Sequence, residues 1–231
     1  MPSILLVRHG QASFGADDYD VLSELGHRQA DVVAARLAAL PGGVGTVVHG
    51  ALRRQRETAE PLLARLGTIA ATDPRFDEYD HEALVASAAA ADPEGLLEGA
   101  ADLDAYLAAA ADRTRAFHAV LEQSLARWIA GVDGGIDETW AAFRARVRDG
   151  VGGVVDGLSS GETAVVVTSG GVIAAVVADA LQLDGDGWSR LNTVIVNSSV
   201  TRLVVGRRGT TVVSVNDHAH LEHDPRLLTY R

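Results

Sequence analysis

The sequence contains no cysteine and no lysine, so all 20 of its strongly basic residues are arginines. Without cysteine the chain has no disulfide, no thiolate nucleophile, no iron–sulfur cluster and no cysteine-ligated zinc site. Without lysine it has no Schiff-base amine and no P-loop lysine. These absences exclude several classes of enzyme and leave histidine, arginine, serine and carboxylates to carry any chemistry. Arginine as the only strongly basic residue in an alanine-rich chain is also typical of a GC-rich bacterial genome.

Positive charge is scarce overall, because 31 acidic residues give the 231-residue chain a net charge of −11. An acidic surface disfavours nucleic acids and acidic membranes, which are bound by clustered positive charge. The longest uncharged apolar stretch, 163–178, is shorter than a membrane span and is interrupted by Thr168 to Gly171. No basic segment precedes the apolar run that ends at Arg8, so no signal peptide is expected. We therefore predict a cytoplasmic protein without a nucleic-acid or membrane partner.

The first ten residues combine an apolar run with reactive side chains. Ile4 to Val7 are typical of a strand buried on both faces of a parallel sheet. Arg8 and His9 follow at the carboxyl end, where open α/β sheets bind ligands. Arginine presents donors that match phosphate oxygens, and a neutral imidazole can attack phosphorus. Gly10 allows a tight turn or a close approach to a ligand. The segment predicts a phosphate site; the alternative is a strand that ends in a surface Arg–His pair.

Three motifs in the first 60 residues have a shared spacing and order. They are Ile4 to Gln11, Leu22 to Gly26 with Gln29 and Ala30, and Leu52 to Arg54 with Thr58 and Ala59. Together they resemble the histidine phosphatase superfamily, which includes the phosphoglycerate mutase-like enzymes, and the resemblance covers essentially the whole chain. It implies one domain over 1–231, a three-layer α/β/α sandwich with a mostly parallel central sheet. An alanine-rich helical insertion at about 83–130 is expected to form a cap beside the site.

The resemblance also implies roles for individual residues. His9 would be the nucleophile, and Arg8 and Arg54 would bind the phosphoryl group. The register from Thr58 selects Arg54, and its neighbours in the arginine cluster are expected on a solvated helix face. Glu78 would be the general acid, since a leaving alkoxide needs a proton. The alternative for Glu78 is a solvated acidic loop.

Several positions depart from the family pattern. Ala12 and Gly15 stand where phosphate-contacting side chains are common, and Ser13 is either a substitute or only a loop hydroxyl. Ser169 replaces a second histidine that contacts the transferred phosphoryl group in most members. With Gly170 it is still expected to bind the substrate, but serine carries no positive charge, so transition-state stabilisation is predicted to be weaker. The histidines that could compensate are His49, His81 and His218; for His49 a bond to a loop carbonyl is the alternative.

Apolar periodicity predicts the elements of the fold. Helices are expected over 23–40, 52–66, 137–155 and 172–181, with two or three more in the insertion. Strands are expected over 46–49, 164–167, 194–196, 200–205 and 210–215, the last two joined by a turn at 207–209. Segments 11–19 and 74–84 are predicted to be loops.

The C-terminal tail holds three histidines among carboxylates, namely His218, His220 and His223 with Asp217, Glu222 and Asp224. Such spacing can bind zinc. However, only eight residues follow His223, and Asn216 with His220 and Leu221 matches the tail of the family. We therefore expect no metal and no other cofactor.

The function predicted from the sequence is hydrolysis of a small phosphorylated substrate, a phosphomonoester, through a phosphohistidine on His9. One alternative is a catalytically impaired protein that binds a phosphorylated ligand without turnover. Further alternatives are a mutase-like phosphotransferase and a metallohydrolase. The sequence leaves the ester and the oligomeric state open.

Overall fold

The computed structural model describes residues 1–13, 20–132, 136–207 and 209–230. Gly15 and most of the predicted loop 11–19 therefore lie outside the described residues, as does Arg208 in the turn predicted at 207–209. The chain divides into two compact units, one formed by 1–78 with 146–231 and the other by 79–145. Each is described separately.

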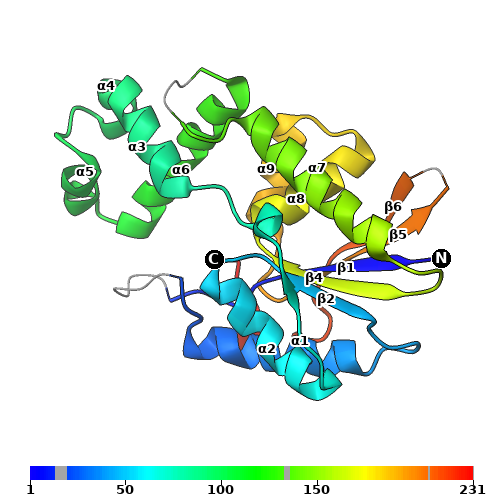
Figure 1. Ribbon diagram of the computed structural model, residues 1–231. Coiled ribbons are helices and arrows are strands. Elements are labelled where there is room, and N and C mark those ends of the chain that lie inside the picture. The colour runs from blue at the N-terminus through cyan, green and yellow to red at the C-terminus, as the bar shows by residue number, and fades with distance from the viewer. Residues whose placement is uncertain (14–19, 133–135, 208, 231) are drawn as a thin grey trace. The chain divides into compact units, whose positions relative to one another are not determined.

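The first unit is built on one sheet, which has six strands in the described residues (Figure 1). Their order is β3-β2-β4-β1-β5-β6. The strands are β1 (Ser3–Arg8), β2 (Thr46–His49), β3 (Ala71–Thr72), β4 (Thr163–Thr168), β5 (Val200–Gly206) and β6 (Gly209–Asp217). The first four in this order pair in parallel, whereas β5 runs antiparallel to both of its neighbours. The predicted α/β class with a mostly parallel central sheet is confirmed.

Helices cover both faces of this sheet (Figure 1). The helices of this unit are α1 (Glu24–Ala38), α2 (Arg53–Leu66), α8 (Gly170–Leu181) and α9 (Gly185–Val194), with 3-10 turns η1 (Pro74–Phe76) and η2 (Pro225–Leu227). Side chains alternate along a strand. Leu5 and Val7 of β1 accordingly share a buried cluster with apolar residues of α1 and α2, and α8 packs against β1 and β6. Helix α7 (Trp140–Gly157) contributes residues to both units.

The second unit contains four helices in its described residues, where two or three were predicted. They are α3 (His81–Ala91), α4 (Pro93–Leu97), α5 (Leu103–Ala109) and α6 (Arg113–Ala130). Each begins after an aspartate whose side chain accepts a hydrogen bond from a backbone N–H of the first turn, at Asp80, Asp92, Asp102 and Asp112. Apolar residues are spread almost evenly along this alanine-rich stretch, so their pattern does not show where one helix ends and the next begins. The aspartate caps mark these boundaries better. The expected cap beside the site stays a prediction.

The other elements agree with the predictions except at a few places. Helix α9 was missed, and the strand predicted over 194–196 is wrong, because Val194 ends α9. The segment 194–196 instead continues into a loop held by the Asn216 side chain, which accepts from the Val196 N–H and donates to the Val194 carbonyl. The short β3 was also missed, and the loop predicted over 74–84 contains η1 and the start of α3.

Gly10 and Gly26 bring two backbones together directly after β1. A Cβ built on Gly10 would lie 2.5 Å from the Gly26 carbonyl oxygen, and one on Gly26 would lie 2.2 Å from the Gln11 carbonyl oxygen. Neither glycine is among the residues with positive φ. The sequence predicted a tight turn or a close approach to a ligand at Gly10, whereas the close approach in the structure is to the backbone of α1.

We expect Gly26→Ala to destabilise the protein by about 3 kcal/mol, because the added methyl group would collide with backbone atoms that cannot rotate away. Gly152→Ala is the matched control, since Gly152 is also in a helix and a Cβ there meets no atom within 4 Å. This control should gain about 0.5–1 kcal/mol from helix propensity. Urea unfolding of both variants measures the two changes. A stabilised Gly26→Ala variant would contradict the contact between the backbones.

Candidate active site

His9 lies directly after β1 and is 6% exposed. Its backbone N–H donates to the Thr168 carbonyl at 2.8 Å, which places it beside the end of β4. The ring Nδ1 lies 2.7 Å from the carbonyl oxygen of Gly10. A carbonyl only accepts, so Nδ1 carries the proton and a neutral ring keeps its lone pair on Nε2. This is the tautomer that a nucleophilic histidine requires.

The surroundings of His9 favour the neutral ring. Burial lowers the pKa of His9 well below its usual value, and the positive charges of Arg54 and Arg8 lower it further; the bond to Gly10 opposes these effects. The imidazole is therefore unprotonated at neutral pH. Its lone pair is available for attack on an electrophile.

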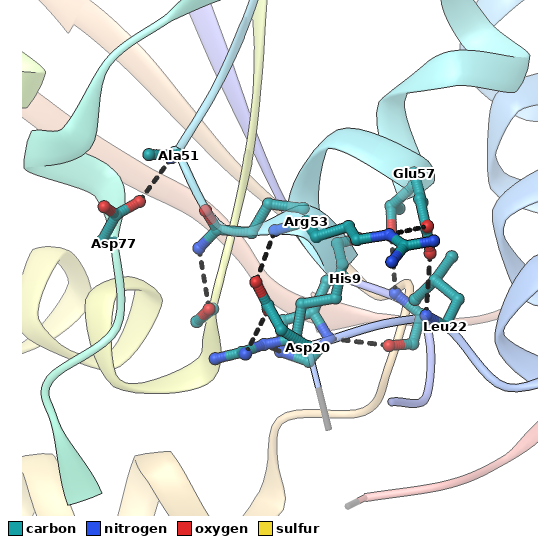
Figure 2. Close-up of polar contacts among 12 residues, drawn as sticks. His9, Asp20, Leu22, Ala51, Arg53, Glu57 and Asp77 are labelled. Atoms are coloured by element: carbon teal, nitrogen blue, oxygen red, sulfur yellow. Dashed lines mark hydrogen bonds and ion pairs between the residues drawn. The ribbon is translucent and has the colours of Figure 1, made fainter. Parts of the chain in front are cut away.

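Arg54 faces the reactive nitrogen from the first turn of α2. Its Nε donates to His9 Nε2 at 3.3 Å, and its Nη1 donates to Asp20 Oδ1 at 2.6 Å. The other oxygen of Asp20 accepts from the Arg53 N–H at 2.8 Å, so this carboxylate also satisfies the amino end of α2 (Figure 2). Arg54 therefore lies beside His9, and its predicted role in binding the phosphoryl group stays a prediction. Asp20 was not identified from the sequence.

Thr58 links the backbone of the site to α2. Its hydroxyl accepts from the Gly10 N–H at 2.9 Å and donates to the Arg54 carbonyl at 2.7 Å. Thr58, from which the spacing selected Arg54, is thus joined both to the backbone after His9 and to Arg54 itself. One turn of α2 places both residues on the side that faces His9.

Arg8 extends from the end of β1 toward the C-terminal part of the chain. Its Nη1 donates to the carbonyl oxygens of Ile195 and Tyr230. These acceptors are neutral, so the bonds orient the guanidinium without cancelling its charge. Gly170 lies against it, since a Cβ there would be 3.5 Å from Arg8 Nε. The carbonyl partners are 187 and 222 residues away in sequence, and no local pattern indicates them.

Two neighbouring carboxyl groups follow η1. Glu78 Oε2 accepts from the Gly171 N–H at 3.1 Å, so the predicted general acid lies at the start of α8. Asp77 Oδ1 accepts from the Ala51 N–H at 2.5 Å (Figure 2). Burial raises the pKa of Asp77, against the opposing effects of its backbone hydrogen bonds and of nearby arginines. Asp77 is thus a second carboxyl near α2 that the sequence did not single out.

Ser169 is fully buried and directly follows β4, whose last residue, Thr168, pairs with Arg8, the residue before His9. Its Oγ accepts from Gln55 Nε2 at 2.9 Å. Of the histidines that could have compensated here, His49 bonds the Gly50 carbonyl and His218 bonds the Asn216 carbonyl through their Nδ1 atoms. His81 makes an edge contact with Phe117 in the second unit. The residue that meets Ser169 is therefore a glutamine that the sequence did not indicate.

The segment before the undescribed residues is tied to the start of α1. Ala12 forms an isolated bridge with Leu22, and the Ser13 N–H donates to the Val21 carbonyl at 2.9 Å. These contacts fix the backbone of Ser13. Its role as a phosphate contact stays a prediction.

The C-terminal histidines have structural partners. His220 Nε2 lies 2.9 Å from the Ser198 carbonyl oxygen, and its Nδ1 lies 2.7 Å from Arg36 Nη1. A guanidinium on Nδ1 leaves no lone pair there for a metal. Within the described ranges no group of three or more histidine or acidic residues is arranged to hold a metal ion. The geometry thus gives no support to the metallohydrolase alternative.

The lowered pKa of His220 predicts how the free energy of unfolding depends on pH. Its pKa is lowered to about 4, mainly by burial and then by Arg36. An unfolded histidine titrates near 6.5, so the unfolded state binds more protons between pH 6.5 and 4, and stability falls as pH falls through this window. One such group contributes at most about 1.4 kcal/mol per pH unit. His220→Gln can keep both hydrogen bonds but does not titrate, so we expect a shallower loss of stability.

Denaturant unfolding at pH 7, 5.5 and 4.5 measures this slope. His223→Gln is the control, because His223 is exposed. Equal slopes for His220→Gln and the wild type would show that His220 is not the group responsible.

The chain belongs to the histidine phosphatase superfamily (branch 1), whose family model matches residues 4–91 and 108–218. None of the curated proteins is a significant match. Among solved structures, a mycobacterial glucosyl-3-phosphoglycerate phosphatase is 22% identical with a TM-score of 0.65, covering 94% of this chain and 99% of its own. Bacillus stearothermophilus YhfR is 19% identical with a TM-score of 0.64, covering 95% of this chain and 99% of its own. An Entamoeba histolytica phosphoserine phosphatase variant in complex with phosphoserine is 16% identical with a TM-score of 0.58, covering 96% of this chain and 100% of its own. At these identities the neighbours show the fold.

No helix in the described part of the chain is both long enough and apolar enough to cross a membrane.

Proposed function

We propose that this protein hydrolyses a small phosphomonoester through a phosphohistidine on His9. The observation that carries the proposal is the hydrogen bonding of the His9 ring. Its Nδ1 proton is held by the Gly10 carbonyl, and its Nε2 lies 3.3 Å from the Arg54 guanidinium. A neutral nucleophile beside a positive charge suits attack on a phosphate dianion.

In the proposed first step, His9 Nε2 forms a bond to phosphorus and the ester P–O bond breaks. Glu78 gives its proton to the leaving oxygen. Arg54 Nε then turns its N–H from His9 to a phosphoryl oxygen, and Arg8 neutralises further charge. Ser169, Gly170 and Ser13 complete the contacts to the phosphoryl group.

In the second step, a water oxygen attacks phosphorus and the P–N bond to His9 breaks. The Glu78 carboxylate takes the proton of the water, and inorganic phosphate leaves. The positioned charges stabilise both transition states, as is general for phosphoryl transfer. The proposal uses no metal and no cofactor.

Phosphate release from a panel of esters tests the proposal. The panel includes phosphoserine and glucosyl-3-phosphoglycerate, which the names of structural neighbours suggest, and p-nitrophenyl phosphate. We expect release that is unchanged by a chelator, and an acid-labile, alkali-stable phosphoryl group on the peptide that contains His9. Binding of inorganic phosphate without any release would instead favour the impaired binding protein, the alternative motivated by Ser169. Isomerisation of a phosphoglycerate without release would indicate a mutase, and loss of activity with the chelator a metallohydrolase.

A further inference from the structure

Ser169 follows the Arg8–Thr168 pair of strands β1 and β4, as His9 does, so the two residues extend from neighbouring strand ends. Ser169 is the residue before the first turn of α8, a position where serine commonly caps a helix. Here its side chain makes no capping hydrogen bond. The hydroxyl is held from another direction, by Gln55 of α2.

The direction of each hydrogen bond between these residues follows from the groups involved. Gln55 Nε2 has two protons: one goes to the Phe76 carbonyl oxygen at 3.0 Å and the other to Ser169 Oγ at 2.9 Å. Because a carbonyl can only accept, the amide cannot be turned over without losing the first bond. Ser169 therefore accepts from Gln55, and its own proton remains to be donated.

That proton has no acceptor within the described ranges, where Gln55 is the hydrogen-bond partner of the Ser169 hydroxyl. Both residues are fully buried. A buried donor without an acceptor destabilises the protein, because the desolvation of its proton is not compensated. A phosphoryl oxygen on His9 would remove this destabilisation by accepting the proton.

We infer that Gln55 is a positioning residue that aims the Ser169 hydroxyl proton at the transferred phosphoryl group. This inference rests on the proposed function and explains how the site works with serine where most family members place a histidine. The pair supplies a directed donor that is neutral and does not titrate. Charge at the phosphoryl group is then left to Arg8 and Arg54.

The packing around Gln55 supports a fixed amide. A Cβ built on Gly50 would lie 2.0 Å from Gln55 Oε1 and 2.5 Å from Asp77 Oδ1, so a side chain there would displace both oxygens from their present positions. Oε1 itself is buried and has no hydrogen-bond partner in the described residues. A buried acceptor without a hydrogen bond needs an explanation. We explain it by the functional requirement that Nε2 of the same amide donates to the Ser169 hydroxyl.

A double-mutant cycle of Ser169→Ala and Gln55→Glu tests the inference. The carboxylate introduced by Gln55→Glu would only accept, so the serine proton would turn to it and away from the phosphoryl group. We expect each single variant to lower kcat by about 10²-fold, which is typical for loss of one transition-state donor. The double variant should lose little beyond Ser169→Ala, because both changes remove the same donor. A loss of kcat in the double variant equal to the product of the two single losses would overturn the inference.

Binding of inorganic phosphate separates failure of this inference from failure of the proposed function. If the wild type releases no phosphate from any ester, the proposed function fails. Both single variants should still weaken phosphate binding by about tenfold, the value of one hydrogen bond to a charged group. Unchanged binding in Ser169→Ala would overturn the inference. Ser124→Ala is the matched control, since Ser124 is equally buried and its hydroxyl bonds the Val120 carbonyl within α6.

A histidine introduced at 169 gives a second test of the contact between Gln55 and the Ser169 hydroxyl. Gln55 touches the Ser169 hydroxyl, so Ser169→His alone has no room for its ring, and we expect no gain in activity. Ser169→His combined with Gln55→Ala removes the obstruction. This double variant should show an additional titrating group in its pH–kcat profile that the wild type lacks. A gain from Ser169→His alone, or no new titrating group in the double variant, would overturn the role of Gln55.

Discussion

Replacement of His9 by alanine is expected to reduce phosphate release by at least about 10³-fold, because it removes the atom that would bond to phosphorus. The phosphoryl group trapped on the peptide of residues around His9 should disappear as well. Arg8 and Arg54 remain in the variant, so binding of inorganic phosphate should persist. Phosphate release, trapping and binding measured on one preparation would check all three outcomes.

The control for this variant is His223→Ala, which changes an exposed histidine whose Nδ1 bonds the His220 carbonyl. The His223→Ala variant should release phosphate at the wild-type rate. Release that survives in His9→Ala would exclude the phosphohistidine mechanism, and release lost equally in both variants would indicate damage to the fold.

Replacement of Arg54 by lysine or methionine is expected to lower kcat/KM by about 10²–10³-fold. Lysine keeps a positive charge but loses the planar fork that donates to both His9 and Asp20. Methionine loses the charge too. Arg56→Lys is the control, since Arg56 is an exposed neighbour in α2 that pairs with Glu60 at 3.7 Å, and it should change kcat/KM by less than about twofold.

The same variants separate charge from geometry through the pKa of His9. The charge of Arg54 lowers that pKa. Arg54→Met should therefore raise the His9 pKa, and Arg54→Lys should raise it less. An NMR titration of the His9 ring measures both. An unchanged pKa in Arg54→Met would show that Arg54 does not act on the imidazole electrostatically.

Much of the framework of the site could be predicted from the sequence. The apolar runs 4–7 and 164–167 form adjacent parallel strands, and the side chains that follow them meet at one edge of the sheet. Ser23, the first residue of the helix predicted over 23–40, caps α1 by accepting from the Gly26 N–H. Arg54 was selected by its spacing from Thr58 within the motif that resembles the family. These features follow local rules, because strand burial, caps and helical spacing depend on residues that are near in sequence.

Errors arose where the local pattern was weak or shared by two structures. The apolar cluster 194–196 suggested a strand, but that segment is the end of α9 and a loop anchored by Asn216. Asn216 lies 22 residues from Val194, and its side-chain amide replaces the pairing that a strand would have needed. No window of neighbouring residues contains that information.

The sequence by itself determined the class of fold, through its buried runs and its resemblance to the histidine phosphatase superfamily, and it determined where His9, Arg8 and Arg54 lie along the elements, since buried runs and helical spacing dictate where each element ends. Only the tertiary structure decided what surrounds them. The contact of Gln55 with Ser169 joins residues 114 apart, and the carbonyl partners of Arg8 lie more than 180 residues away. Such contacts depend on how whole elements pack, because a side chain can bond only to what the fold brings within about 3 Å of it.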